Sequence, residues 1–521
     1  MKRIFAIIMT ICLMASVLSV PAFALKEAPT PTSPVLSVSV LKRDAEKPEL
    51  VGEYYVFEDG WNAAIDLATS KEKLKAYKAE RVVVDLLADW TAVDDDFGSG
   101  SGFDWSTIFI PGDTKITLNM NGHTIDRDLK TDDYDGEVIH VDEKADLIIN
   151  GGKSGDPIIM PGQPAGDVKM GTITGGWSCN GAAGIFIDNY AKVELNNVNV
   201  VGNIADYDDG AGIGVYAGAT LVMNGGSVSE NVIKVDFALV SIYCGAGVLV
   251  EKATATLNGV TLENNMHNGI EHSTLLWGAA VYSKDSTVTL KNCLIKDNGL
   301  ITEYVDEESD TDPDAPVEKT NSTIATVFGW GGTMVIENTD FIGNGVKDTW
   351  GHHQATYYTV LIDIENVEFT MTGGKVTGNN QVFLLDIYDS TVNVNGVDFT
   401  GNESLAMSKG DDLLKTSTFT NCKFSAGTPY GDYNHDFRFK GSKPKITFVD
   451  CDFGEATFNN KSAAKFENTA NGVGSLFGEG SLTNILVIIS LVISVAAICL
   501  AIASHKKKAV LATANEAEKS E

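Results

Sequence analysis

An asparagine that recurs at the end of short apolar segments constrains this fold more than any other feature of the sequence. An apolar residue, two residues of any type and an asparagine follow one another seven times between Val200 and Asn402. The asparagines are Asn203, Asn231, Asn265, Asn298, Asn344, Asn379 and Asn402. Self-similarity at a period of about 20 to 50 residues is typical of solenoids and other repeat architectures.

The intervals between these asparagines are uneven because five of them are followed directly by insertions of variable length. The insertions are 204–209, 232–244, 266–277, 299–321 and 345–358. Without them, a nearly constant unit of about 22 residues remains, and the unit Gly245–Asn265 contains the strand-like segments GVLV, ATLN and VTLE. Three such short strands cannot enclose a core alone. We therefore expect the units to stack as coils of a parallel β-solenoid.

Stacking aligns equivalent side chains of successive coils at about 4.8 Å. We predict that the seven asparagines form a structural ladder, in which each adopts a left-handed turn and hydrogen-bonds buried backbone groups. A second, inward-facing ladder of small or branched side chains comprises Val198, Gly226, Val260, Cys293, Thr339, Gly374, Val397, Cys422 and Cys451. Its cysteines are expected to be buried core residues, since a metal site would need soft ligands in a closed cluster.

Glycine–alanine segments open several of the units. They are GAAGI at Gly181, GAGI at Gly210, GAGV at Gly245 and GAAV at Gly278. With the F-x-x-N-like ends, they resemble the repeats of chlamydial polymorphic outer-membrane proteins and, more broadly, right-handed parallel β-helices of the pectate-lyase-like superfamily. Over residues 104–468 the resemblance implies an all-β, right-handed parallel β-helix of about 12 coils with three short strands each.

The predicted solenoid is flanked by segments of a different character. Residues 1–24 have the lysine–arginine start, apolar run and AFA end of a secretory signal peptide, and 25–52 are expected to be a disordered linker. Residues 53–103 are expected to be an N-terminal cap with an amphipathic helix from Trp61 to Tyr77 and a buried strand after it. Residues 469–481 are expected to be a flexible tether.

The last part of the sequence predicts a membrane anchor. The uncharged segment within 482–504 has the length of a transmembrane helix, and HKKK follows it. By the positive-inside rule the 505–521 tail would be cytoplasmic and the solenoid extracellular. The chlamydial proteins instead end in an outer-membrane barrel, so the resemblance does not imply an outer-membrane location. We expect a single-pass protein of the cell membrane, in a bacterial envelope of the Gram-positive type.

The net charge restricts the partners. It is −31 at pH 7, with a pI near 4.5. Nucleic acid is therefore excluded as a partner, because its phosphates require a basic footprint, and anionic polymers are unfavourable for the same reason.

The enzymes of the resembled superfamily raise the alternative of a polysaccharide lyase or hydrolase. The acidic loop DYDDG offers Asp206, Asp208 and Asp209 as catalytic carboxylates or as a calcium site. However, the arginines between 104 and 481 are Arg127 and Arg438, and no G-H-G or R-x-K pattern of polygalacturonases follows. We expect no catalytic residue, resident cofactor or metal centre, with these three aspartates and calcium as the alternative.

The insertions are the stronger candidates for a functional site. If all five leave the coil at the same corner, stacking gathers them on one flank, where repeat proteins often bind partners. Aromatic and histidine side chains in them suit stacking on sugar rings or contact with protein. The candidate binding residues are Tyr207, Trp277, Trp350, His352, His353, Tyr357 and Tyr358. The leading hypothesis is a non-catalytic, adhesin-like binder of glycan or a surface protein, and the further alternative is a structural spacer.

Overall fold

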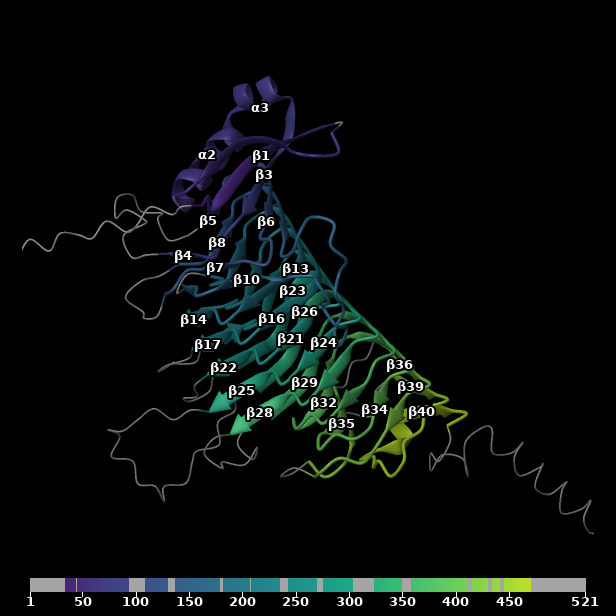
Figure 1. The fold of residues 1–521 in the computed structure, drawn as a ribbon. Helices are drawn as coiled ribbons and strands as arrows, with labels where there is room; N and C mark the ends of the chain where they lie inside the picture. Colours follow the sequence, from purple (N-terminus) through teal and green to yellow (C-terminus); the bar gives the residue numbers. More distant parts are fainter. Residues whose placement is uncertain are drawn as a thin grey trace, which may run out of the picture.

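The structure is a computed structural model in which most of the chain forms one long sheet of short parallel strands (Figure 1). It describes residues 33–43, 45–92, 108–129, 136–178, 181–206, 208–234, 242–268, 275–302, 323–348, 358–410, 415–429, 433–440 and 445–469. The main sheet contains 32 strands, and the strands of successive coils pair in parallel. The all-β, mostly parallel and repetitive architecture predicted from the sequence is confirmed, and it fits a parallel β-helix.

Each coil contributes strands to rows that run along the stack. The first row consists of β5 (Ile108–Ile110), β8 (Ile139–Val141), β12 (Ile185–Ile187), β15 (Ile213–Val215), β19 (Val248–Glu251), the first half of β23 (Leu275–Lys291) and of β26 (Thr323–Glu337), β29 (Tyr358–Glu365), β32 (Phe383–Tyr388), β35 (Leu405–Lys409) and β38 (Phe437–Phe439). The short β18 (Ile242–Cys244) pairs with the start of β23.

The second row follows the first around a tight corner. It consists of β3 (Ala79–Leu86), β6 (Lys115–Asn119), β9 (Asp146–Asn150), β13 (Lys192–Val201), β16 (Thr220–Ser229), β20 (Thr254–Asn258), the second halves of β23 and β26, β30 (Glu368–Thr372), β33 (Thr391–Asn395), β36 (Ser417–Thr420), β39 (Ile446–Val449) and β40 (Ala464–Glu467). A 3-10 turn, η2 (Lys461–Ala463), precedes β40.

The third row closes the coil. It consists of β4 (Trp90–Thr91), β7 (Thr124–Asp126), β10 (Gly171–Thr174), the ends of β13 and β16, β21 (Thr261–Glu263), β24 (Leu294–Lys296), β27 (Asp340–Ile342), β31 (Val376–Thr377), and the pair β34 (Asp398–Phe399) and β37 (Lys423–Phe424). Alternate side chains of all three rows point inward, so that isoleucine, leucine and valine fill most of the interior. In the last coils phenylalanines fill it, including Phe419, Phe437, Phe448 and Phe453.

The seven asparagines form a continuous ladder of hydrogen bonds after the third row. In each step the side-chain Nδ2 donates to the Oδ1 of the next asparagine, at 2.9 to 3.1 Å from Asn203 to Asn402. The backbone N–H of each donates to the same Oδ1. All except Asn402 are fully buried. The ladder therefore satisfies polar backbone groups inside the stack, as buried groups require.

The expected conformation of these asparagines is wrong by one position. The residue before each of them has the positive φ, as in Glu230 at 57° and Asn264 at 55°. The ladder asparagines keep a negative φ because their side chains must point inward to reach the next coil. A second left-handed corner precedes the inward-facing ladder, for example at Asn292 and Gly396.

The N-terminal end differs from the prediction in two respects. The predicted linker 25–52 contains β1 (Leu36–Lys42), which pairs antiparallel with β3 and with β2 (Glu49–Tyr54). The apolar side chains of β1 are buried, which explains why this segment is ordered. The predicted single helix is two helices, α2 (Phe57–Thr69) and α3 (Lys71–Tyr77), because Ser70 ends the first and accepts a hydrogen bond from the Lys73 N–H of the second.

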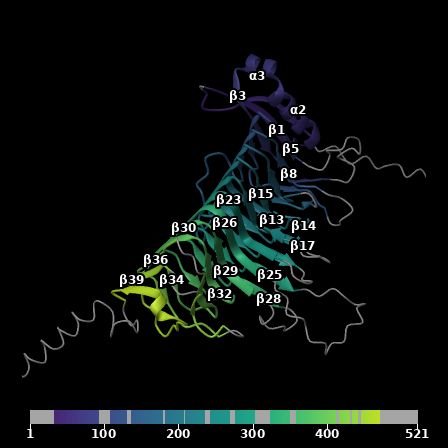
Figure 2. The same cartoon turned by 180° about the vertical axis from the view of Figure 1, so that it is seen from behind.

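The helices and the β1–β2 pair lie at one end of the stack in both ribbon views (Figures 1 and 2). Phe57 and Trp61 of α2 are buried in the same core as Val82 and Val84 of β3. Among the described residues, no helix has the length and apolar character needed to cross a membrane. The predicted signal peptide, transmembrane segment and cytoplasmic tail, and the tether beyond its first residue, lie outside the described residues.

Candidate functional site

The five insertions begin on one flank of the stack. Directly after each of the first five ladder asparagines, three or four residues form a strand of a separate parallel sheet. These five strands are β14 (Ile204–Asp206), β17 (Val232–Lys234), β22 (Met266–Asn268), β25 (Gly299–Thr302) and β28 (Gly345–Asp348). The sixth strand of the sheet, β11 (Trp177–Ser178), lies before the first ladder asparagine and pairs with β14. Figure 1 shows β14, β17, β22, β25 and β28 stacked along the same side. The insertions therefore share a point of departure, which sequence spacing alone had left as an inference.

The predicted aromatic residues of this flank divide into two groups. Tyr207, Trp350, His352, His353 and Tyr357 lie outside the described residues. Trp277 and Tyr358 are described, and both belong to strands of the first row, β23 and β29. The insertions that end at Trp277 and Tyr358 thus return to the coil at the first row. The outer face of that row is therefore the surface next to these insertions.

The outer face of the first row carries two lines of aligned side chains, which we call the first-row face. One line runs in register through Phe109, His140, Phe186, Gly214, Leu249, Tyr282, Phe328, Asp363 and Asp386. The parallel line, two residues further along each strand, runs through Glu251, Lys284, Trp330, Glu365 and Tyr388. Most of these coils thereby place an aromatic or an acidic side chain on this face.

Trp277 is anchored in the middle of the first-row face. Its ring stacks on Phe328 with centroids 4.3 Å apart and lies 6.4 Å from Tyr282. Trp330 meets Trp277 edge-on at 6.3 Å and is 41% exposed. These rings cover a small apolar cluster that is separate from the interior core. The half-buried ring of Trp277 therefore packs against its neighbours, whereas the ring of Trp330 is accessible to a ligand.

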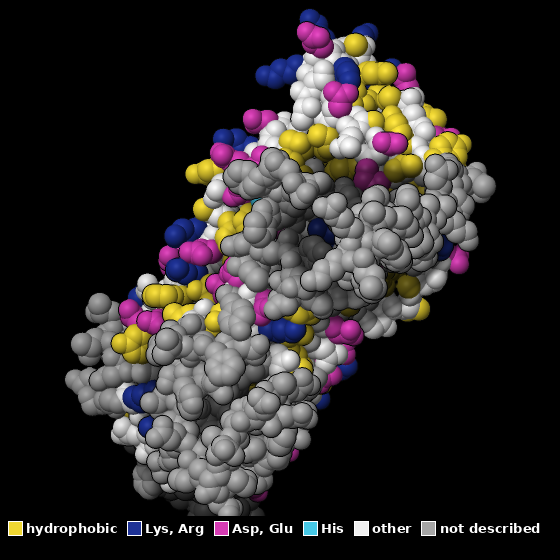
Figure 3. Space-filling view, turned by 90° about the vertical axis from the view of Figure 1, so that its left-hand side faces the viewer, with side chains coloured by type: hydrophobic (Ala, Val, Ile, Leu, Met, Phe, Trp, Pro, Cys, Tyr) yellow, Lys and Arg dark blue, Asp and Glu magenta, His cyan; other side chains and the backbone are white. Residues whose placement is uncertain are grey.

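A charged pair lies beside these aromatic rings. The ammonium of Lys284 is 3.1 Å from a carboxylate oxygen of Glu251 and 5.7 Å from the ring centre of Trp330. An ion pair next to an exposed ring provides hydrogen-bonding groups at the edge of a stacking surface. Figure 3, which faces the flank of the insertions, shows basic and acidic side chains interspersed over the described part of the surface.

The predicted acidic loop does not bring its three carboxylates together. Asp206 is buried and accepts a hydrogen bond from the indole N–H of Trp177 at 3.3 Å. Asp208 accepts from the Gly181 N–H at 2.7 Å, and Asp209 accepts from the Cys244 N–H at 2.5 Å. Each carboxylate thus holds a different part of the backbone or core, which does not match a shared catalytic or calcium centre.

Burial changes the acidity of Asp209. The pKa of Asp209 is raised to about 7, mainly because the side chain is buried away from solvent. The hydrogen bond from the Cys244 N–H lowers the pKa, and the nearby charge of Asp208 raises it. The carboxyl group therefore titrates near neutral pH.

Two other carboxylates are brought together by the register. Asp363 of β29 is directly opposite Asp386 of β32, and the hydroxyl of Tyr358 donates to Asp386. Burial raises the pKa of Asp363 well above its ordinary value, and the charge of Asp386 adds to that effect. The pKa of Asp386 is also raised by burial, although the bond from Tyr358 opposes the shift. This pair was not predicted, because the two residues belong to different units without a shared motif.

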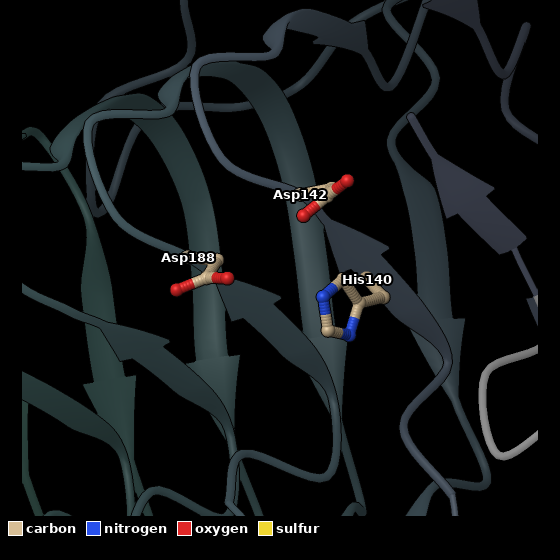
Figure 4. A group of neighbouring side chains, drawn as sticks. All are labelled: His140, Asp142 and Asp188. Atoms are coloured by element: carbon tan, nitrogen blue, oxygen red, sulfur yellow. The ribbon is translucent and has the colours of Figure 1, made fainter. Parts of the chain in front are cut away.

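A third group lies near the N-terminal end of the face. His140, Asp142 and Asp188 each place a potential ligand atom within 4.8 Å of the others. Figure 4 shows the three side chains together, with one ring nitrogen of His140 directed toward the aspartates. This group was not predicted from the sequence, since Asp142 and Asp188 are 46 residues apart and are aligned only by the stacking of β8 and β12.

A cavity of about 210 Å³ lies on the outside of the second row. Polar residues line it, among them Asn150, Lys153, Asp156 and Asn196. It is smaller than the roughly 300 to 1,000 Å³ of most small-molecule sites. The first-row face is therefore the better candidate for a site.

Comparison with known proteins does not add to these observations. No protein-family model, no curated protein and no solved structure matches this chain.

Proposed function

We propose that this protein is a membrane-anchored, extracellular β-solenoid that binds glycan without cleaving it, through the first-row face and the insertions beside it. The observation that carries the proposal is the placement of the exposed aromatic rings. Phe109, Trp330 and Tyr388 are 42%, 41% and 58% exposed, and all three belong to the first-row face. Trp330 and Tyr388 lie two coils apart in one line, and Phe109 begins the other line. Solvent-exposed rings on one face suit sugar rings, whose C–H faces stack on them.

The polar groups between the rings support a glycan more than an apolar ligand. Glu251 and Lys284 precede Trp330 in the line of aligned side chains, and Glu365 lies between Trp330 and Tyr388. Sugar hydroxyls need such donors and acceptors at the edges of the stacking surface.

A protein partner of similar chemistry is the alternative occupant. If neither binds, the remaining function is that of a spacer, in which stacking at about 4.8 Å per coil sets the length.

The binding experiment uses the full chain in detergent, screened on a glycan array and then measured by calorimetry. We expect Trp330→Ala and Tyr388→Ala to weaken binding about tenfold each, the equivalent of about 1.4 kcal/mol. Tyr190→Ala is the matched control, because Tyr190 is 61% exposed but sits at a corner outside this face. Undiminished binding by both variants would contradict the placement of the site.

The Asp363–Asp386 pair favours a second candidate function, cleavage of a polysaccharide. Aligned residues of neighbouring parallel strands lie about 4.8 Å apart, close to the roughly 5 to 5.5 Å between the two carboxyl groups of retaining glycosidases. Their raised pKa values suit one protonated and one ionised group. Reducing-end release or an unsaturated-uronate absorbance that disappears in Asp386→Asn would establish this function in place of simple binding.

The cellular location forms a separate part of the proposal and rests on the apolar segment within 482–504. We expect the full chain to be recovered in the membrane fraction and its solenoid to be cleaved by protease added to intact cells. A variant that lacks residues 482–521 should be released into the medium. Protection of the solenoid from external protease would contradict the proposed orientation.

A further inference from the structure

We propose that His140, Asp142 and Asp188 bind a divalent transition-metal ion, such as zinc or manganese, at the N-terminal end of the first-row face. This inference does not depend on the proposed glycan binding. The three residues lie at a different place in the fold from the acidic loop at Asp206, Asp208 and Asp209.

The stacking of two coils creates the ligand group. His140 lies in β8, Asp142 follows that strand, and Asp188 follows β12. The two strands pair in register at Val141 and Ile187, so that the aspartates directly after these residues are neighbours. Their carboxylate oxygens and a ring nitrogen of His140 lie within 4.8 Å of one another. Ligand atoms at about 2.0 to 2.2 Å from one ion are at most about 4.4 Å apart, so binding would draw these side chains slightly together.

The imidazole of His140 is held in a fixed orientation. Its Nδ1 is 2.6 Å from a carboxylate oxygen of Glu137, which is 12% exposed. The ring is also sandwiched between Phe109 and Phe186, at centroid distances of 5.4 and 4.8 Å. A carboxylate on one ring nitrogen fixes the tautomer that leaves the other nitrogen, Nε2, as a metal ligand. Glu137 thus acts as a positioning residue.

The charge around the group favours a cation. Glu137, Asp142 and Asp188 bring three carboxylates to one small, partly buried region. Within the part of the chain that the structure describes, no lysine or arginine forms an ion pair with Asp142 or Asp188. The neighbouring Lys144 pairs with Glu143 instead. A divalent ion would supply the compensating charge that the protein does not.

The donor set selects among metals. One imidazole nitrogen and two carboxylate oxygens suit zinc or manganese, whereas calcium prefers six to eight oxygen ligands. Three protein ligands leave at least one coordination position open to water or to a ligand on the same face.

The test measures binding of zinc and manganese to the full chain, purified in detergent without a histidine tag. We expect about one ion per chain by calorimetry and by elemental analysis after dialysis, with calcium bound at least tenfold more weakly. His140→Ala and Asp188→Asn should abolish this binding. Glu137→Gln should retain it at about 10- to 100-fold lower affinity, as removal of an orienting partner does.

His123→Ala is the matched control. His123 also lies beside a carboxylate, with its Nδ1 3.1 Å from Asp89, but it is not part of the group. Its variant should bind zinc as the native chain does, and thermal unfolding without metal should show that all variants fold. Unchanged stoichiometric zinc binding in folded His140→Ala and Asp188→Asn would overturn the inference, as would binding of calcium alone.

Discussion

The Nδ2 of Asn265 donates to the Oδ1 of Asn298 at 2.9 Å, and the backbone N–H of Asn265 donates to the same oxygen at 3.0 Å. Both residues are completely buried. One oxygen atom therefore satisfies two donors of the neighbouring coil, and repetition of this contact links successive coils along the solenoid.

Replacement of Asn298 by alanine is expected to destabilise the protein on the order of 3 kcal/mol. The change leaves two donors of Asn265 without that acceptor and removes donors to Asn344 and to the Leu262 carbonyl. Each buried polar group left unpaired costs about 1 to 3 kcal/mol. Chemical denaturation measures the loss. Asn402→Ala, at the half-buried end of the ladder, should cost about 1 kcal/mol, and equal losses at the two positions would contradict this account.

Alanine substitutions at two glycines separate the cost of a strained backbone from the cost of a steric clash. Gly374 and Gly396 both have a positive φ, at 85° and 68°. A Cβ atom on Gly374 would lie 2.2 Å from the Thr339 carbonyl oxygen, whereas one on Gly396 would meet nothing within 4 Å. Gly396→Ala should therefore cost about 1 to 2 kcal/mol from the left-handed conformation alone. Gly374→Ala should cost clearly more in the same unfolding measurement, and a smaller loss there would argue against close contact between these coils.

The phenylalanine core of the last coils should unfold locally when it is weakened. Phe448 is fully buried, with Phe419, Phe453 and Phe466 at centroid distances of 5.0 to 5.5 Å. Phe448→Ala removes about 3 to 5 kcal/mol of packing. Because a coil contacts only its neighbours, we expect faster hydrogen exchange in β36, β39 and β40 and little change before β29. Phe109→Ala, at an exposed ring, should not alter exchange in these strands.

The raised pKa of Asp209 predicts that the protein becomes less stable as the pH rises toward neutral. The pKa of Asp209 is raised from 3.8 to about 7, so the folded state holds the proton more tightly than the unfolded state. The free energy of unfolding should therefore fall as the pH rises from about 4 to about 7, by no more than about 4 kcal/mol from this group. Asp209→Asn should remove that fall and be the more stable form at pH 8. Glu230→Gln, at an exposed carboxylate, is the control, and parallel pH profiles of the native chain and Asp209→Asn would contradict the prediction.

Much of the fold could be predicted because its strongest determinant is local and repeated. The asparagine pattern, the inward ladder and the positions of the insertions are visible in the order of residues. The left-handed conformation was predicted for the ladder asparagines but belongs to the residue before each of them. A sequence pattern shows which residue recurs, but it does not show which residue has the positive φ. The strand β1 was missed because its burial depends on pairing with β3, about 40 residues later.

The candidate site was predicted less well than the fold. The carboxylates of the DYDDG loop are adjacent in sequence, yet Asp206 and Asp209 hydrogen-bond to different parts of the chain. Asp363 and Asp386, and likewise His140 and Asp188, belong to different coils and come together through strand register. Insertions of unequal length separate such residues by unequal intervals, so no fixed spacing reveals them.

By itself, the sequence determined that the chain forms a parallel β-solenoid with a structural asparagine ladder, because each coil must bury its apolar side chains against the next. Only the tertiary structure decided which side chains of neighbouring coils lie next to one another on the outer face. Register between parallel strands is fixed by the packing of the whole stack. The outer face, which contributes little to that packing, is where the aromatic rings, the carboxylate pair and the His140 group are brought together.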